Sequence, residues 1–205
     1  MRDLRQALAE IELIRGQVAR ATQFRGYGPA TLAGTGMLAI AAAFAQAALV
    51  GDPSRHADAY LKLWVATAAL SLTLISVEAI SRSRRAHSAL ALPMLRSAGQ
   101  EFLPAIVAGL LLTVVIARAA PQSVWMLPGL WQVIFSLGVF SSCRFLPRPM
   151  FVVGLWYLTC GLILLARGDG GQALAPWAMG VPFGIGQMLV AAVLRFGYRE
   201  ANELP

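Results

Sequence analysis

Long apolar stretches alternate with short clusters of charged residues along most of the chain. A helix that crosses a bilayer needs about 20 mostly apolar residues. The predicted spans are 29–50, 60–80, 102–119, 123–142, 150–166 and 174–195. Strand-like alternation is absent, and lipid leaves only helices or closed barrels to satisfy the backbone. The pattern therefore predicts an all-α, polytopic membrane protein, a bundle of six transmembrane helices.

Residues 1–28, before the first span, predict a cytoplasmic amphipathic helix. One face carries the apolar residues Leu4, Ala7, Leu8, Ile11, Ile14, Val18 and Ala21, and the other carries Arg2, Arg5, Gln6, Gln17 and Arg20. This helix could lie on the membrane surface, with its arginines against anionic headgroups. It could instead dock into a groove of a protein partner or of a second copy of the chain. With acids and no continuous apolar core, the segment is not expected to be a cleaved signal peptide.

Basic residues are distributed unevenly between the two ends of the predicted spans. Thirteen of the 17 lie before the first span, in the second and fourth loops, at the end of the last span (Arg195) or in the tail at 196–205, and four lie on the opposite side. The positive-inside rule then places both termini in the cytoplasm. The abundance of arginine and alanine indicates a prokaryotic cytoplasmic membrane as the location.

Composition supports the same class of protein. Hydrophobic residues make up 58% of the chain and charged residues 13%. The net charge of +7 is divided among short clusters between apolar runs, which is typical of topology signals rather than of nucleic-acid binding. The lipid bilayer is thus the expected partner, and small-residue faces on several spans also make a homo-oligomer plausible.

Short outer loops group the six spans into three hairpins, each ending on a cytoplasmic arginine: Arg82, Arg144 and Arg195. Their uneven spacing leaves open whether the hairpins are an internal repeat. This layout resembles the HdeD-like group of small bacterial membrane proteins. The resemblance covers the overall layout, includes no diagnostic motif and assigns no role to any residue.

The last span is the least regular. Gly180 and Gly184 form a GxxxG spacing that allows close approach of another backbone. Pro182 removes one helical hydrogen bond and should kink or unwind the segment, freeing carbonyl groups near Gln187. Such interruptions build binding sites in many transporters. Close packing and a ligand site both remain open for this span.

Other polar positions are few. Glu78 is the strongest candidate for a buried charge, but Arg82 lies four residues later and is well placed to pair with it. Thr113 and Gln132 are the other polar residues that we predict to line a transport or ligand pathway. In the loop after the second span, Arg84 and Arg85 should rest on lipid headgroups or contact a partner subunit.

The sequence contains none of the residue patterns that we associate with catalysis. The only two histidines, His56 and His87, are predicted on opposite membrane faces, so they cannot share a metal or a haem. No GxSxG or GKS/GKT sequence occurs. We therefore expect no enzymatic activity, no metal and no cofactor.

The sequence favours a small non-enzymatic membrane protein with an accessory, sensing or stress-related role. It would act through helix packing and its cytoplasmic amphipathic helix. The alternative is a small-solute transporter, or a membrane subunit that works with a separate ATPase. In that case Glu78, Thr113, Gln132 and Gln187 would line a path beside the last span.

Overall fold

The computed structural model describes residues 28–85, 91–143, 149–168 and 172–203. These residues form α-helices and one 3-10 helix, and the described part contains no strand. The elements are α2 (Pro29–Leu49), α3 (Ala57–Arg85), α4 (Ala91–Ala119), η1 (Pro121–Met126), α5 (Leu127–Ser142), α6 (Met150–Ala166) and α7 (Pro176–Glu203). The all-α prediction is confirmed for this part of the chain. The predicted amphipathic helix lies outside it, apart from Gly28.

Proline and glycine define many of the helix ends. Pro29 and Pro128 occupy the first turns of α2 and α5, where a missing N–H leaves no helical bond unmade. Gly51 and Gly168 have φ angles of 63° and 70° just beyond α2 and α6, a conformation that glycine adopts without a steric penalty. The predicted boundaries of the fifth span, 150–166, agree with α6.

Between the second and third predicted spans, α3 continues to Arg85 and α4 begins at Ala91. Both helices therefore extend beyond the apolar segments Ala57–Arg82 and Gly99–Ala119, which are suited to cross a membrane. Pro93 lies in the first turn of α4, where proline costs no helical hydrogen bond.

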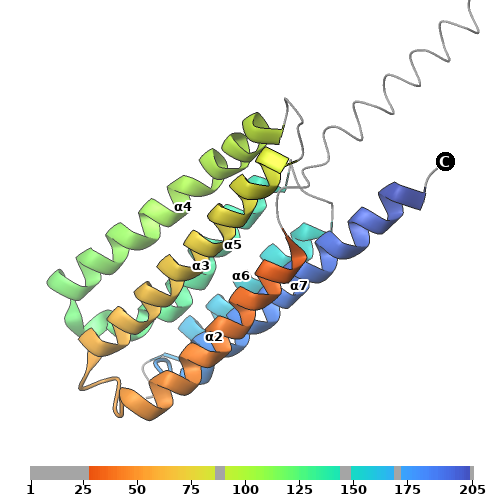
Figure 1. Cartoon of the computed structure of the whole chain (residues 1–205). Coiled ribbons are helices and arrows are strands. Elements are labelled where there is room, and N and C mark those ends of the chain that lie inside the picture. The colour runs from red at the N-terminus through yellow and green to blue at the C-terminus, as the bar shows by residue number, and fades with distance from the viewer. Residues whose placement is uncertain (1–27, 86–90, 144–148, 169–171, 204–205) are drawn as a thin grey trace, which may run out of the picture.

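The helices run side by side, each antiparallel to the next (Figure 1). The most extensive contacts join α2 to α7 and α5 to α6, so the first and last described helices are neighbours. The predicted hairpin partners also touch, whereas α3 and α4 touch each other only slightly. We call the end with residues 50–56, 167–168 and 172–175 the Gln46 end, and the opposite end the Glu78 end.

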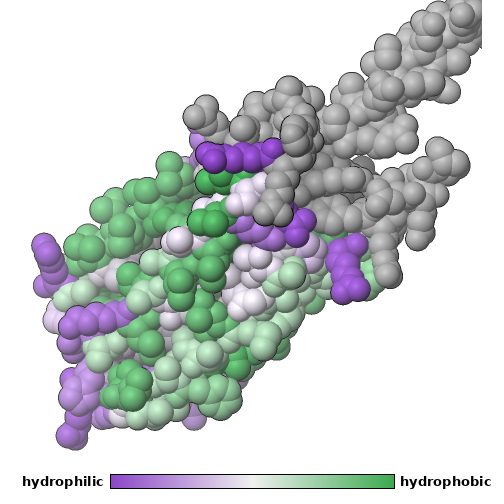
Figure 2. Space-filling view, viewed as in Figure 1, coloured by the Kyte–Doolittle hydropathy of each residue, from purple (hydrophilic) through white to green (hydrophobic). Residues whose placement is uncertain are grey.

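Five helical segments are long and apolar enough to cross a membrane: α2, α3, α4, α7, and η1 together with α5. The sixth, α6, is shorter, at 17 residues. Hydrophobic residues cover the middle of the face shown in Figure 2, and hydrophilic residues gather at both ends. Large apolar side chains such as Phe44 and Met37 are 73% and 64% exposed. Lipid, unlike water, accommodates such a surface without cost. This distribution is that of a membrane-embedded protein.

An aromatic cluster joins four of the helices inside the bundle. Phe135 of α5 makes ring contacts with Phe102 of α4, Tyr157 of α6 and Phe183 of α7, at centroid distances of 5.2, 4.7 and 5.5 Å. Tilted and edge-on pairs at this range are favourable for aromatic rings. The cluster fills the space between these four helices.

Candidate functional site

The first half of α7 carries the irregular sequence, but the helix continues from Pro176 to Glu203 through Pro182. Of the two predicted effects of Pro182, unwinding is therefore wrong, and a kink stays a prediction. Proline at position 182 has no N–H to offer the carbonyl of Ala178, four residues earlier. The Nε2 of Gln132, on α5, donates to this carbonyl oxygen at 2.9 Å, and Gln132 is fully buried. A neighbouring helix thus replaces the hydrogen bond that the proline removes.

Two further carbonyls, one in the turn before α7 and one within α7, accept side-chain donors from other helices. Gln46 Nε2 of α2 donates to Leu174 O, in the turn, at 2.6 Å, and Trp156 Nε1 of α6 donates to Pro182 O at 3.0 Å. Ala178 and Pro182, four residues apart, lie on one side of α7. Three helices therefore hold the start of α7 and the turn before it through backbone carbonyls.

Gln46 also connects α3 to this arrangement. Its Oε1 accepts a hydrogen bond from Trp64 Nε1 at 2.7 Å, so both ends of the buried amide are satisfied. The sequence analysis missed Gln46. The signal that could have identified it is the isolated glutamine in AAAFAQAAL, because an amide in an apolar span normally finds a partner on another helix.

Glycines bring α2 and α7 into backbone contact. A Cβ added to Gly180 would lie 2.5 Å from Ala43 Cβ, and one added to Gly184 would lie 2.8 Å from Ile40 Cγ1. Gly36 faces Gly184 in turn, with its Cβ position 3.0 Å from the Gly184 carbonyl oxygen. The GxxxG spacing is thus used for close packing against α2, one of its two predicted uses.

The other predicted pathway residues lie at separate interfaces. Thr113 Oγ1 accepts from Trp131 Nε1 at 2.8 Å between α4 and α5, and donates to Gly109 O at 2.7 Å. Gln187 packs beside Gly36 in the α2 and α7 contact. The structure therefore does not bring Thr113, Gln132 and Gln187 together in one site, and their role in a pathway stays a prediction.

Glu78 lies near the opposite end of α3. Arg82 Nε donates to its Oε1 at 2.9 Å, which confirms the predicted ion pair. The Glu78 carboxylate also occupies the space where a Cβ on Gly28 would lie, at the start of α2. A negative charge is favourable at a helix N-terminus. Arg84 is exposed nearby in sequence, and the Arg85 side chain lies outside the description.

Four buried side-chain oxygens lack a hydrogen bond in the part of the chain that is described: Tyr60 OH, Gln132 Oε1, Tyr157 OH and Gln187 Oε1. Two of them are neighbours, because the Tyr157 hydroxyl packs against Gly186 and faces the Gln187 amide. A buried unpaired oxygen costs free energy. The Tyr157 hydroxyl and the Gln187 amide thus lie close enough to interact with each other.

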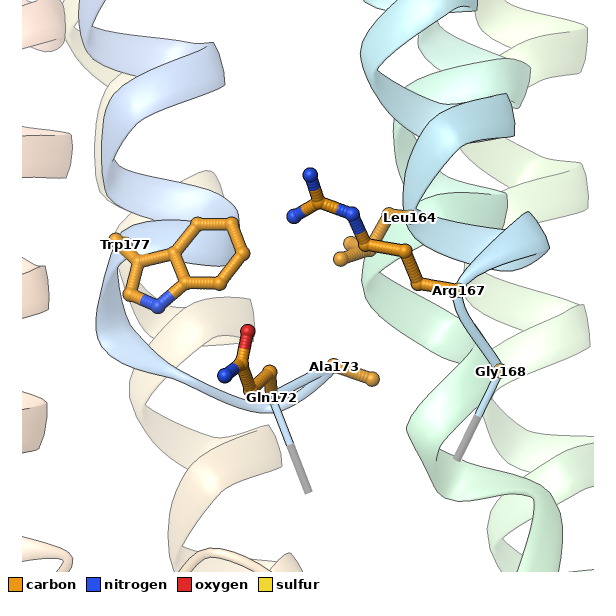
Figure 3. A pocket seen from close by; sticks show the side chains of 6 residues that line it. All are labelled: Leu164, Arg167, Gly168, Gln172, Ala173 and Trp177. Atoms are coloured by element: carbon orange, nitrogen blue, oxygen red, sulfur yellow. The ribbon is translucent and has the colours of Figure 1, made fainter. Parts of the chain in front are cut away.

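A cavity of about 220 Å³ lies at the Gln46 end, between the end of α6 and the start of α7 (Figure 3). Its lining residues are Leu164, Arg167, Gly168, Gln172, Ala173 and Trp177. The Arg167 Cζ lies 6.0 Å from the ring centroid of Trp177, within the range of a cation–π contact. Across the described ranges, no three His, Cys, Asp or Glu side chains are grouped as metal ligands.

Comparison of the chain with protein-family models, with curated proteins and with solved structures found no match.

Proposed function

We propose that the protein is a small non-enzymatic membrane protein with an accessory, sensing or stress-related role, which acts through residues 1–28. In this proposal α6 is a sixth span and both termini are cytoplasmic, in accordance with the positions of the basic residues. The bundle anchors the amino-terminal segment, which binds the membrane surface or a protein partner.

The observation that carries this proposal is the hydrogen bond from Gln132 to the Ala178 carbonyl. A transporter would use the carbonyl freed by Pro182 as a ligand for its substrate. Here that carbonyl already has a buried partner. The same helix is joined by backbone contact to α2, the helix that directly follows residues 1–28. These features favour a stable anchor.

Deletion of residues 1–24 tests the proposal. We expect partner co-purification from crosslinked membranes to be lost, while the remaining bundle keeps its helical circular dichroism, apart from the contribution of the deleted helix, and still elutes as a single folded species. A sharper test compares substitutions on the two faces of this segment. Leu4→Ser and Leu8→Ser change the apolar face, and Gln6→Ser and Gln17→Ser change the polar face. Only the substitutions on the apolar face should weaken co-purification and membrane-surface binding. An unchanged set of captured proteins and lipids in the deletion would contradict the proposal.

Transport is the second candidate, and the unpaired oxygens of Tyr157 and Gln187 favour it, because they could bind a polar solute. Under this candidate Glu78→Gln and Pro182→Ala should change uptake in cells, or flux in liposomes that contain candidate ATPases. Flux that matches empty liposomes in every condition would argue against transport and in favour of the anchor.

A further inference from the structure

The cavity at the Gln46 end combines an apolar floor with polar groups at its opening. Leu164 and Ala173 are buried beneath it, whereas Arg167, Gln172 and Trp177 are exposed around it. The turn at Gly168, with φ 70°, separates the end of α6 from the start of α7 and leaves the space between them. Figure 3 shows the Arg167 guanidinium and the Trp177 indole extending toward each other. The Gln172 amide lies below the indole in this view.

Among the described residues that line this cavity, Arg167 is the only ionised one, and it carries a positive charge. The ion pairs found among the described residues involve Arg55, Lys62 and Arg82, so Arg167 makes none of them. Guanidinium, carboxamide and indole all offer N–H donors. An arginine in this position is suited to a phosphate, because its planar fork can donate two parallel hydrogen bonds.

The size of the cavity and the residues around it limit the class of ligand further. A volume of about 220 Å³ is below that of typical drug-sized pockets, about 300 Å³ or more, and suits a small polar group. One helical turn toward the centre of the bundle, Ile163 on α6 and Val181 on α7 are 49% and 48% exposed. These residues continue the faces of Arg167 and Trp177 as an apolar surface suitable for acyl chains. Tryptophan at the edge of an apolar belt is typical of the membrane interface.

We propose that this cavity binds the phosphate headgroup of an anionic phospholipid, with Arg167 on the phosphate and the acyl chains along Ile163 and Val181. The phosphate accepts hydrogen bonds from the guanidinium and from the Gln172 amide. The Trp177 ring holds the arginine in place by the cation–π contact. The assignment is independent of the role proposed for residues 1–28.

The test measures lipid retention by the full chain in native mass spectrometry, after exchange into detergent with phosphatidylglycerol or phosphatidylcholine of identical acyl chains. The wild type should retain phosphatidylglycerol in preference to phosphatidylcholine. Arg167→Gln should weaken phosphatidylglycerol binding about tenfold, as expected for the loss of a charge-assisted hydrogen bond. Trp177→Leu should weaken it by a smaller factor.

Arg118→Gln is the matched control. Arg118 is an exposed arginine in the last turn of α4, at the same end of the bundle, and it does not line the cavity. Its substitution removes the same charge and should leave lipid retention at the wild-type level. Equal losses in the two arginine variants, or equal retention of the two lipids, would overturn the proposal. Arg167-dependent binding of inorganic phosphate or glycerol phosphate without lipid retention would assign the cavity to a free anion and overturn the lipid assignment.

Discussion

Two pairs of apolar helices differ in how much of their surface is buried. Helices α2 and α7 pack closely together, whereas α3 and α4 expose most of their residues. In the spans of α3 and α4 only 11% of the residues are buried, against 33% in α2 and 44% in α7. Glycines let α2 and α7 approach closely, while α3 and α4 direct large side chains such as Leu74 and Val115 outward. Burial in this bundle therefore follows the distribution of small residues rather than hydrophobicity.

The hydrogen bonds of polar side chains also differ between the two regions. On α3, the hydroxyls of Thr67 and Thr73 donate to carbonyls of their own helix, Leu63 O and Ala69 O, both at 2.8 Å. Such local bonds need no neighbour. The amides of Gln46 and Gln132 reach carbonyls near or within α7. Three hydrogen bonds from other helices thus end on carbonyls at the start of α7 or in the turn before it, which fixes the position of this segment.

The largest expected effect separates two glycines. Gly180→Leu should lower the free energy of unfolding by about 3 kcal/mol, because its side chain would overlap Ala43. Gly34→Leu, on the outer side of α2 with open space around its Cβ position, should cause no loss. Titration with SDS in detergent micelles, followed by circular dichroism, measures both. Equal losses would show that the α2 and α7 contact has no special weight.

A smaller effect is expected at the buried amides. Gln46→Leu should lower the free energy of unfolding by about 2 kcal/mol, because it leaves Trp64 Nε1 and Leu174 O without partners. Gln100→Leu is the matched control, since Gln100 is exposed on α4, and it should change stability little. If the control lost as much as Gln46→Leu, the contrast between the two regions would fail.

The smallest effect is expected on α3. Thr73→Val removes an exposed hydroxyl that bonds only within its own helix, and should change the same unfolding free energy by less than about 0.5 kcal/mol. A loss of several times this size would mean that the outer face of α3 is packed against another molecule, such as a second copy of the chain.

The sequence predicted what depends on neighbouring residues. Helix positions, the Glu78 and Arg82 pair and the close packing at Gly180 all follow from local spacing. Beyond the hairpin partners, it did not predict which helices touch, because many arrangements of six apolar helices satisfy the same pattern. The contact of α2 with α7, the partner of Gln132 and the cavity at Arg167 all depend on that arrangement.

The central claim is that Gln132 replaces the hydrogen bond removed by Pro182, and a double-mutant cycle of Gln132→Leu and Pro182→Ala tests it most directly. In the wild-type background Gln132→Leu leaves the Ala178 carbonyl without a partner. With Pro182→Ala, a backbone N–H at position 182 can donate to that carbonyl. Gln132→Leu should then cost about 1 kcal/mol less than in the wild type. Strictly additive unfolding free energies would contradict the claim.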